Sequence, residues 1–337
     1  MGVVQQLRSL RAGSRVKTAQ VWLHARLSVN VWHSGRMIAY GFSEYGGPET
    51  EYFLDMPIAD PGQGQLLVAV HAAGVNPADW KVRAGNRKDT VQTVLPAVLG
   101  REVSGTIVQV GTHVDGFSVG DHVFGATAAG HGAYAQYTVL NASATAHKPA
   151  NVTFAAAATL PVAAGTAYDA LEQLALRKED TLLVLGAGGG VGSAALQLAR
   201  ADGIDTIGVA SAGKREWVTS LGAEFVESGD EYAERITTGP DGVLDIVGGA
   251  ALRAVAPAMR AGTRIISVAD PVLAASLGGS GVVRNRSSDA FTRLAELVAS
   301  GVLDPHIGHT FPLERAGDAL ALVETGHVQG KVVIEVG

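Results

Sequence analysis

The fold is decided by the stretch Thr181-Leu-Leu-Val-Leu-Gly-Ala-Gly-Gly-Gly-Val-Gly-Ser-Ala-Ala-Leu-Gln-Leu-Ala-Arg200. Its first five residues form an apolar run typical of a β-strand, and an alanine- and leucine-rich pattern typical of a helix opens at Ser193. Five glycines lie in between, at Gly186, Gly188, Gly189, Gly190 and Gly192. Strand, glycine turn and helix in this order indicate a βα unit of a nucleotide-binding sheet.

The glycine turn suits the pyrophosphate of a dinucleotide. Glycine has no Cβ to block the approach of the phosphates, and a helix N-terminus offers free N–H groups and a positive dipole end. The spacing Gly186-x-x-Gly189-x-x-Gly192 differs from a strict G-x-G-x-x-G, and glycine runs also occur in purely structural turns. The flanking strand and helix favour binding, so we predict that the five glycines and Val191 contact a dinucleotide.

Composition restricts the class of protein. The 337 residues are 47% hydrophobic and 17% charged, which is typical of a compact soluble enzyme of about two domains. No apolar run approaches the ~20 residues that span a membrane. The net charge of −6 argues against a nucleic-acid partner. The absence of cysteine excludes disulfides, a thiol nucleophile and thiolate-bound metal, and it fits a cytoplasmic location.

Residues 1–36 differ from the rest of the chain. They hold six of the 26 basic residues and none of the 32 acidic ones. A basic, acid-free segment has some features of a mitochondrial targeting sequence. We favour a non-core extension that precedes the folded chain, which we expect to begin with a strand at Met37.

From Met37 to about Ala157 the sequence predicts a β-rich domain. Short apolar runs alternate with turn signals, as in a small barrel. The predicted strands are Leu66–Ala73, Gly105–Val110, His122–Gly125 and Tyr134–Leu140.

Several motifs in this region and beyond resemble the medium-chain dehydrogenases/reductases, and more narrowly their zinc-free quinone oxidoreductase branch, which includes the zeta-crystallin-like enzymes. Besides the glycine turn, the motifs are Val75–Lys81, Pro96–Gly105, Gly120–Gly125, Gly132–Tyr137, Leu160–Tyr168 and Gly330–Ile334. The resemblance extends essentially from Met37 to Gly337. It implies an α/β protein in which a GroES-like β-rich catalytic domain (37–157 and 301–337) accompanies a Rossmann domain with a doubly wound parallel sheet (158–300). It also implies a homodimer.

The sequence departs from the zinc-dependent relatives at their metal positions. Those relatives carry cysteine where Asn76 stands and a His-Glu pair where Arg101-Glu102 stands. Arginine cannot bind zinc, because it is a permanent cation without an acceptor. His306, His309 and Asp304 form the one local cluster to check, and we interpret them as surface residues. We therefore predict no metal site.

The choice between NADPH and NADH depends on the residues after the predicted strand Asp205–Ala210. An NAD site places an acid there for the ribose 2′-hydroxyl, whereas this chain has Ser211, Lys214 and Arg215. A hydroxyl and two cations suit a 2′-phosphate, so we predict NADPH. The alternative is that the two cations are the solvated start of the next helix, where Glu216 could pair with either.

The resemblance also implies which residues lie near the nicotinamide end of the cofactor. Thr166 matches such a position, although threonine is also a common helix N-cap. The ends of two predicted strands, at Asp241–Gly248 and Thr263–Ala269, lie beside the nicotinamide in relatives. The residues implied in this way are Thr166, Val247, Gly248, Val268, Ala269 and Lys331. A solvated lysine at the start of a strand remains an alternative for Lys331.

The last third of the chain contains ordinary helix patterns. Ser288–Ser300 and Pro312–Glu324 predict amphipathic helices, and Lys331–Val336 predicts a strand that returns to the first domain. We expect the small-residue segment Pro271–Gly281 to be a loop.

These features together predict an NADPH-dependent, zinc-independent oxidoreductase that transfers hydride to a quinone. Asn76 is the candidate donor to the acceptor or the ribose, and Lys81 is a weaker candidate that could equally be a surface lysine. Two alternatives stay open. One is an enoyl or alkenal reductase acting on α,β-unsaturated carbonyls, which must also protonate carbon. The other is a non-catalytic NADPH-binding protein.

Overall fold

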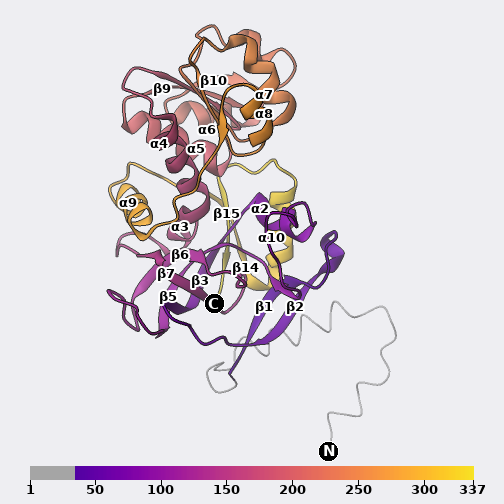
Figure 1. The fold of residues 1–337 in the computed structure, drawn as a ribbon, viewed down its shortest axis with the longest axis vertical. Coiled ribbons are helices and arrows are strands. Elements are labelled where there is room, and N and C mark those ends of the chain that lie inside the picture. The colour runs from indigo at the N-terminus through magenta and orange to yellow at the C-terminus, as the bar shows by residue number, and fades with distance from the viewer. Residues whose placement is uncertain (1–34) are drawn as a thin grey trace, which may run out of the picture.

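The structure is a computed structural model that describes residues 35–337. It contains two six-stranded sheets that lie in the upper and lower halves of an elongated molecule (Figure 1). Predictions on residues 1–34 lie outside the described part of the chain. Strand β1 begins at Arg36, one residue before the predicted Met37.

The upper sheet is parallel throughout, with the strand order β10-β9-β8-β11-β12-β13. Numbered along the chain within this sheet, the order is 3-2-1-4-5-6, which is that of the doubly wound dinucleotide-binding fold. The strands are β8 (Thr181–Leu185), β9 (Asp205–Ala210), β10 (Glu224–Glu227), β11 (Gly242–Asp245), β12 (Arg264–Ser267) and β13 (Ser280–Gly281).

Helices cover both faces of this sheet. Alternate residues of β8 point to opposite faces, so Leu182 and Val184 join one hydrophobic cluster while Leu183 and Leu185 join another. The helices are α4 (Gly165–Leu174), α5 (Gly190–Ala201), α6 (Arg215–Ser220), α7 (Gly249–Val255) and α8 (Pro271–Ser276). Burial on both faces explains the continuous apolar strands.

The lower half is built on the order β14-β15-β3-β5-β6-β7, with a further β3–β7 pairing that closes four strands into a barrel. A small sheet, β2-β1-β4, lies beside it. The strands are β1 (Arg36–Phe42), β2 (Glu51–Pro57), β3 (Gln65–Val75), β4 (Ala97–Val98), β5 (Glu102–Val110), β6 (His122–Thr127), β7 (Tyr137–His147), β14 (Ile307–Pro312) and β15 (Lys331–Glu335). The predicted combination of a β-rich, barrel-like part and a doubly wound parallel sheet is confirmed.

The chain passes between the two halves twice. It leaves the barrel through α3 (Phe154–Ala157) and a π-helical turn at Leu160–Ala164, and it returns after α9 (Ser288–Ala299). The two passages are adjacent, since Asn151 Nδ2 donates to the carbonyl of Ala299 at 2.9 Å. After β14 the chain forms α10 (Ala316–Glu324) and then β15. The division at residues 157 and 300 stays a prediction.

Two predicted elements differ from the structure. Pro271–Gly281 is not a loop but α8 followed by the short strand β13. Asp270 caps this helix by accepting from the amide of Leu273 at 3.0 Å, and Pro271 occupies its first turn, where its missing N–H costs nothing. The helix predicted over Pro312–Glu324 begins later than expected, at Ala316. Over residues 35–337, no helix is both long and apolar enough to cross a bilayer.

Candidate active site

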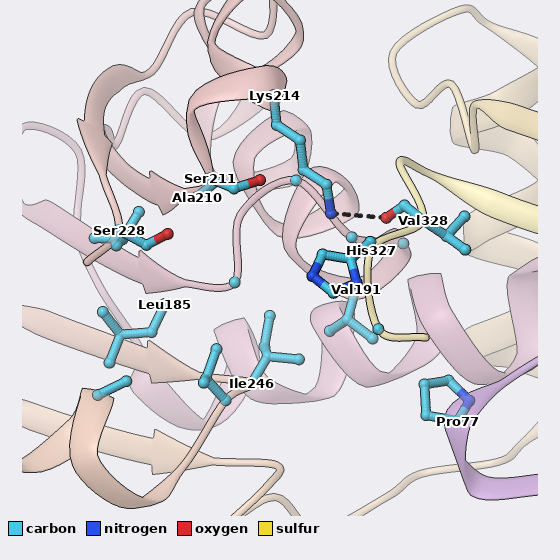
Figure 2. A pocket seen from close by; sticks show the side chains of 18 of the residues that line it. Pro77, Leu185, Val191, Ala210, Ser211, Lys214, Ser228, Ile246, His327 and Val328 are labelled. Atoms are coloured by element: carbon cyan, nitrogen blue, oxygen red, sulfur yellow. Dashed lines mark hydrogen bonds between the residues drawn. The ribbon is translucent and has the colours of Figure 1, made fainter. Parts of the chain in front are cut away.

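A cavity of about 780 Å³ lies between the two halves of the molecule. One wall is formed at the carboxyl ends of β8, β9 and β11, the edge at which open α/β sheets bind their ligands. The opposite wall comes from α2 (Pro77–Arg83), the end of α10 and the segment before β15. Figure 2 shows this arrangement, with Leu185 and Ile246 on the sheet side and His327, Val328 and Pro77 across from them.

The glycine turn forms the floor of the cavity and fits a pyrophosphate group. Gly186 adopts φ +90°, a conformation open to glycine, and a Cβ on Gly192 would overlap the carbonyl oxygen of Gly186. Helix α5 then begins at Gly190 without a side-chain cap at Gly189. Its first N–H groups therefore have no partner within the helix and are available to an anion. Of the predicted contacts, Gly186, Gly188, Gly189, Gly190 and Val191 line the cavity, and Gly192 packs beneath it.

Of the three residues predicted to distinguish NADPH from NADH, two line the cavity and the third does not. Ser211 and Lys214 line the cavity, and Lys214 Nζ donates across it to the carbonyl of Val328 at 2.8 Å (Figure 2). Burial lowers the pKa of Lys214. Arg215 points elsewhere, because it pairs with Glu227 at 3.5 Å and lies over the Phe225 ring at 4.3 Å.

Residues that follow β10 also line the cavity, and no motif in the sequence marks them. They are Ser228, Gly229, Asp230, Glu231 and Tyr232. Figure 2 places Ser228 on the same side of the cavity as Ser211. The rule that ligands bind beyond the carboxyl ends of parallel strands could have found Ser228. The hydroxyl of buried Tyr232 donates to the carbonyl of Ala251, and burial raises its pKa to about 12.

Lys331, Asn76 and Glu102 form a buried polar cluster at the other end of the cavity. Lys331 Nζ donates to Asn76 Oδ1 at 2.6 Å and to Glu102 Oε1 at 2.9 Å. The Asn76 amide donates to the same carboxylate oxygen at 2.8 Å, and Glu102 Oε2 accepts from the amide of Val162 at 2.7 Å. Lys331 is therefore not solvated: it is 4% exposed, as is Asn76, and Glu102 is fully buried.

Lys81 and Lys331 have different surroundings. Lys81 lies on α2 and is exposed, with its ammonium 5.6 Å from the centre of the Trp80 ring. Both lysines line the cavity. The stem of Lys331 packs on Gly190 at the start of α5, so this side chain connects the polar cluster to the glycine turn. The geometry thus favours Lys331 over Lys81 as the cation beside Asn76.

The comparisons with known proteins agree with this architecture. Residues 62–150 match the family model described as alcohol dehydrogenase GroES-like domain, and residues 221–334 match the one described as zinc-binding dehydrogenase. The 2-methylene-furan-3-one reductase of Solanum lycopersicum is 32% identical over 95% of this chain and 84% of its own length. The chain belongs to the medium-chain dehydrogenase/reductase superfamily.

Further similarities place it within this superfamily. The chloroplastic NADPH-dependent alkenal/one oxidoreductase of Arabidopsis thaliana is 31% identical over 98% of this chain and 91% of its own length. The solved structure of the quinone oxidoreductase from Coxiella burnetii superposes with a TM-score of 0.83 at 30% identity, over 90% of this chain and all of that one. The chain is a member of the zinc-free, quinone oxidoreductase-like branch of the medium-chain dehydrogenases/reductases.

The metal positions of this superfamily carry other chemistry here. Asn76 and Glu102 are both hydrogen-bonded to the Lys331 ammonium. A divalent metal cation placed beside them would be repelled by this positive charge. In the described part of the chain, no group of three or more potential metal-ligating residues occurs. His306 stacks on Trp217 at 3.9 Å between ring centres.

The positions carried over from the superfamily for the nicotinamide end divide into two groups. Val247 lines the cavity, as does Lys331, whereas Gly248, Val268, Ala269 and Thr166 are not among the lining residues. Thr166 is 4% exposed, donates to the carbonyl of Val162 and accepts from Arg284 at 2.7 Å. It is not a helix N-cap either, because α4 begins one residue earlier, at Gly165.

Proposed function

We propose that this protein is an NADPH-dependent, zinc-independent oxidoreductase that passes hydride to a quinone. The observation that carries the proposal is one cavity with a phosphate-binding glycine turn at one end and the Lys331–Asn76–Glu102 cluster at the other. A bound nicotinamide cofactor would supply the hydride. The chain supplies the position of the reactants and the electrostatic environment.

The cofactor would lie along the cavity in one orientation. The N–H groups at the start of α5 suit its pyrophosphate, which leaves the adenosine end near Ser211 and the nicotinamide end near Asn76 and Lys331. Val247, together with the predicted Gly248, Val268 and Ala269, would flank the nicotinamide ring.

NADPH is preferred because of the residues at the adenosine end. Ser211 offers a hydroxyl and Lys214 a cation, and β9 ends without an acid. Asp230 and Glu231 are exposed carboxylates farther round the rim, which act against the phosphate. Relatives are named for both cofactors, as NADPH-dependent, NAD(P)H and NAD-dependent enzymes. The ratio of the Kd values for NADPH and NADH measures whether the attraction by Lys214 outweighs the repulsion by these carboxylates.

The acceptor end offers a means of stabilising a developing oxyanion without zinc. The Lys331 ammonium donates its three N–H groups to Asn76 Oδ1, Glu102 Oε1 and the carbonyl of Val75, and one of these bonds would be exchanged for a bond to the acceptor oxygen. Asn76 holds that charge in place and adds an amide dipole. A reduced quinone can take its protons from water, so no dedicated general acid is needed.

The second candidate is reduction of α,β-unsaturated carbonyls. Two of the relatives are named for reduction of a furanone and of alkenals or enones. Lys331 would then stabilise the enolate while a proton reaches carbon. A non-catalytic NADPH-binding protein would keep the cavity but show no turnover.

Steady-state assays separate these functions. Purified protein is assayed with NADPH and NADH against 1,4-naphthoquinone and 2-alkenals. We expect oxidation of NADPH that depends on the quinone, at a higher kcat/KM than with the alkenals. Turnover of alkenals alone would replace the quinone proposal, and tight NADPH binding without turnover would indicate the non-catalytic role. Sedimentation analysis tests the homodimer, which remains a prediction, as does the cytoplasmic location.

A further inference from the structure

Four arginines lie on segments that adjoin the Asn76 end of the cavity, outside its lining residues. Arg87 lies in the loop after α2, and Arg101 directly precedes β5. Arg284 and Arg286 lie between β13 and α9. The guanidinium groups on these three segments are close enough for their charges to act on one another.

Hydrogen bonds fix where these segments meet. Glu102, the residue after Arg101, accepts from the amide of Val162, while Arg284 donates to the neighbouring carbonyl of Pro161 at 2.9 Å. The start of β5 and the β13–α9 loop thus converge on the same π-helical turn. Because Asn76 donates to Glu102, this turn also adjoins the polar cluster of the cavity.

Only one of the four guanidinium groups has an acidic partner. Arg284 pairs with Asp169 at 2.8 Å and also donates to Thr166. Among residues 35–337, by contrast, no hydrogen bond or ion pair is made by the guanidinium groups of Arg87, Arg101 or Arg286. Arg286 and Arg87 are exposed and Arg101 is half-buried, so all three can be reached by a ligand.

The neighbouring acids offset only part of this excess, since Asp79 attracts Arg87 and Asp169 attracts Arg286. Asp169 is used by Arg284 and by the amide of Asn285. Asp79 accepts from the backbone N–H of Asn76 and from the Tyr134 hydroxyl, and it forms no ion pair with any residue between 35 and 337.

The arginines also influence one another electrostatically. Partial burial, and then the charges of Arg284, Arg101 and Arg87, lower the pKa of Arg286 to about 10. Partial burial and Arg101 likewise lower the pKa of Arg87. An arrangement of like charges that repel one another is unfavourable in the free protein and becomes favourable when an anion binds.

We propose that Arg87, Arg101 and Arg286 bind an anionic group on the electron acceptor, a carboxylate or a sulfonate-like oxyanion, while its reducible carbonyl lies at Asn76 and Lys331. This inference rests on the proposed function and specifies its substrate class. Guanidinium groups suit such oxyanions because their N–H groups form paired, charge-assisted hydrogen bonds.

Matched acceptor pairs test the proposal. The pairs are 1,4-naphthoquinone-2-sulfonate with 1,4-naphthoquinone, and (E)-4-oxo-2-pentenoate with its methyl ester. For each pair that the enzyme reduces, we expect the anionic acceptor to have a KM about tenfold lower than the neutral acceptor. That advantage should shrink as ionic strength rises, because salt screens exposed charges.

Variants assign the effect to the cluster. Arg286→Gln should raise the KM for the anionic acceptor about tenfold and so abolish the ratio between the two members, and Arg286→Lys should retain part of it. Arg293→Gln is the control, because this exposed arginine lies on α9 and pairs with Glu296. Equal KM values within each pair, or an unchanged ratio in Arg286→Gln, would overturn the proposal.

A binding measurement separates this inference from the proposed function. Calorimetry records the affinity of the protein loaded with oxidised NADP⁺, which cannot reduce the quinone, for 1,4-naphthoquinone-2-sulfonate, with and without Arg286→Gln. Binding that is lost in the variant, without reduction of any acceptor, would support the anion site and reject the reductase function. Reduction of neutral acceptors, with no binding of the sulfonate, would reject the anion site alone.

Discussion

The Lys331 ammonium lies 2.9 Å from Glu102 Oε1 in a site from which water is largely excluded. The lysine begins β15 and the glutamate begins β5, and the two are 229 residues apart in the sequence. Because Lys331 also packs on Gly190, this ion pair joins the barrel to the glycine turn. Its removal should therefore affect both stability and catalysis.

Lys331→Met should lower the free energy of unfolding by about 3–5 kcal/mol, because the buried carboxylate of Glu102 would lose its partner. Urea denaturation measures the effect, and the double variant Lys331→Met/Glu102→Gln should recover part of the loss. Arg315→Gln breaks an exposed pair with Asp318 and should stay within about 1 kcal/mol of the parent protein. A Lys331→Met protein as stable as this control would contradict the importance of the pair.

The glycine turn can be tested with one methyl group. Gly192→Ala should raise the Kd for NADPH at least about tenfold and lower the melting temperature, because its Cβ would overlap the backbone oxygen of Gly186. In Gly213→Ala the added Cβ meets nothing within 4 Å, so cofactor binding should be nearly unchanged. Fluorescence titration with NADPH compares the two. Similar Kd values for both variants would show that the turn does not depend on this close approach.

Cofactor preference should depend on Lys214 and not on Arg215. Lys214→Gln should raise the Kd for NADPH about tenfold and leave that for NADH nearly unchanged, because only NADPH carries the 2′-phosphate. Arg215→Gln should have a small effect, since Arg215 is engaged with Glu227 and Phe225. The same titration with both cofactors checks this. A larger effect at Arg215 would mean that this side chain turns toward the phosphate on binding.

Asp79 should make the protein less stable as the pH rises from about 4 to 6. Burial raises the pKa of this carboxyl group to about 6, so the native state holds a proton that the unfolded chain has already released. Stability therefore falls with rising pH across this window, by about 2 kcal/mol between pH 4.5 and 7.

Asp79→Asn cannot titrate and removes this contribution. Denaturation at the two pH values should show a smaller loss for the variant than for the parent protein. An identical pH dependence in both would exclude Asp79 as its source.

The sequence predicted best those elements whose signals are local. Strand β9 lies at the predicted residues, and β8 begins at Thr181 as expected, because an apolar run between turn residues suffices to mark a buried strand. The loop predicted at Pro271–Gly281 was wrong, because its small residues resemble those of a loop. Helix α8 forms there because Asp270 caps it and because Leu273 and Ala274 pack in the core. Context overrides local preference there.

The site was predictable where it follows the chain and not where it depends on distant partners. The glycine turn and Ser211 were found because they follow β8 and β9 directly. The choice between Lys81 and Lys331 could not be made from sequence, because only the folded chain shows that Lys331 meets Glu102. The orientation of Arg215 depends similarly on Glu227 and Phe225, which lie on β10.

The hydrogen bond between Asn151 and Ala299 has a consequence for the architecture as a whole. The segment that carries the parallel sheet leaves the barrel and rejoins it at neighbouring points, so its ends are as close as those of a surface loop. A segment with adjacent ends can be replaced by the homologous segment of a relative without changing the fold of the barrel that it leaves and rejoins. Exchanging residues 152–298 between relatives should therefore change which cofactor is used while leaving β3, β5 and β15 paired as they are.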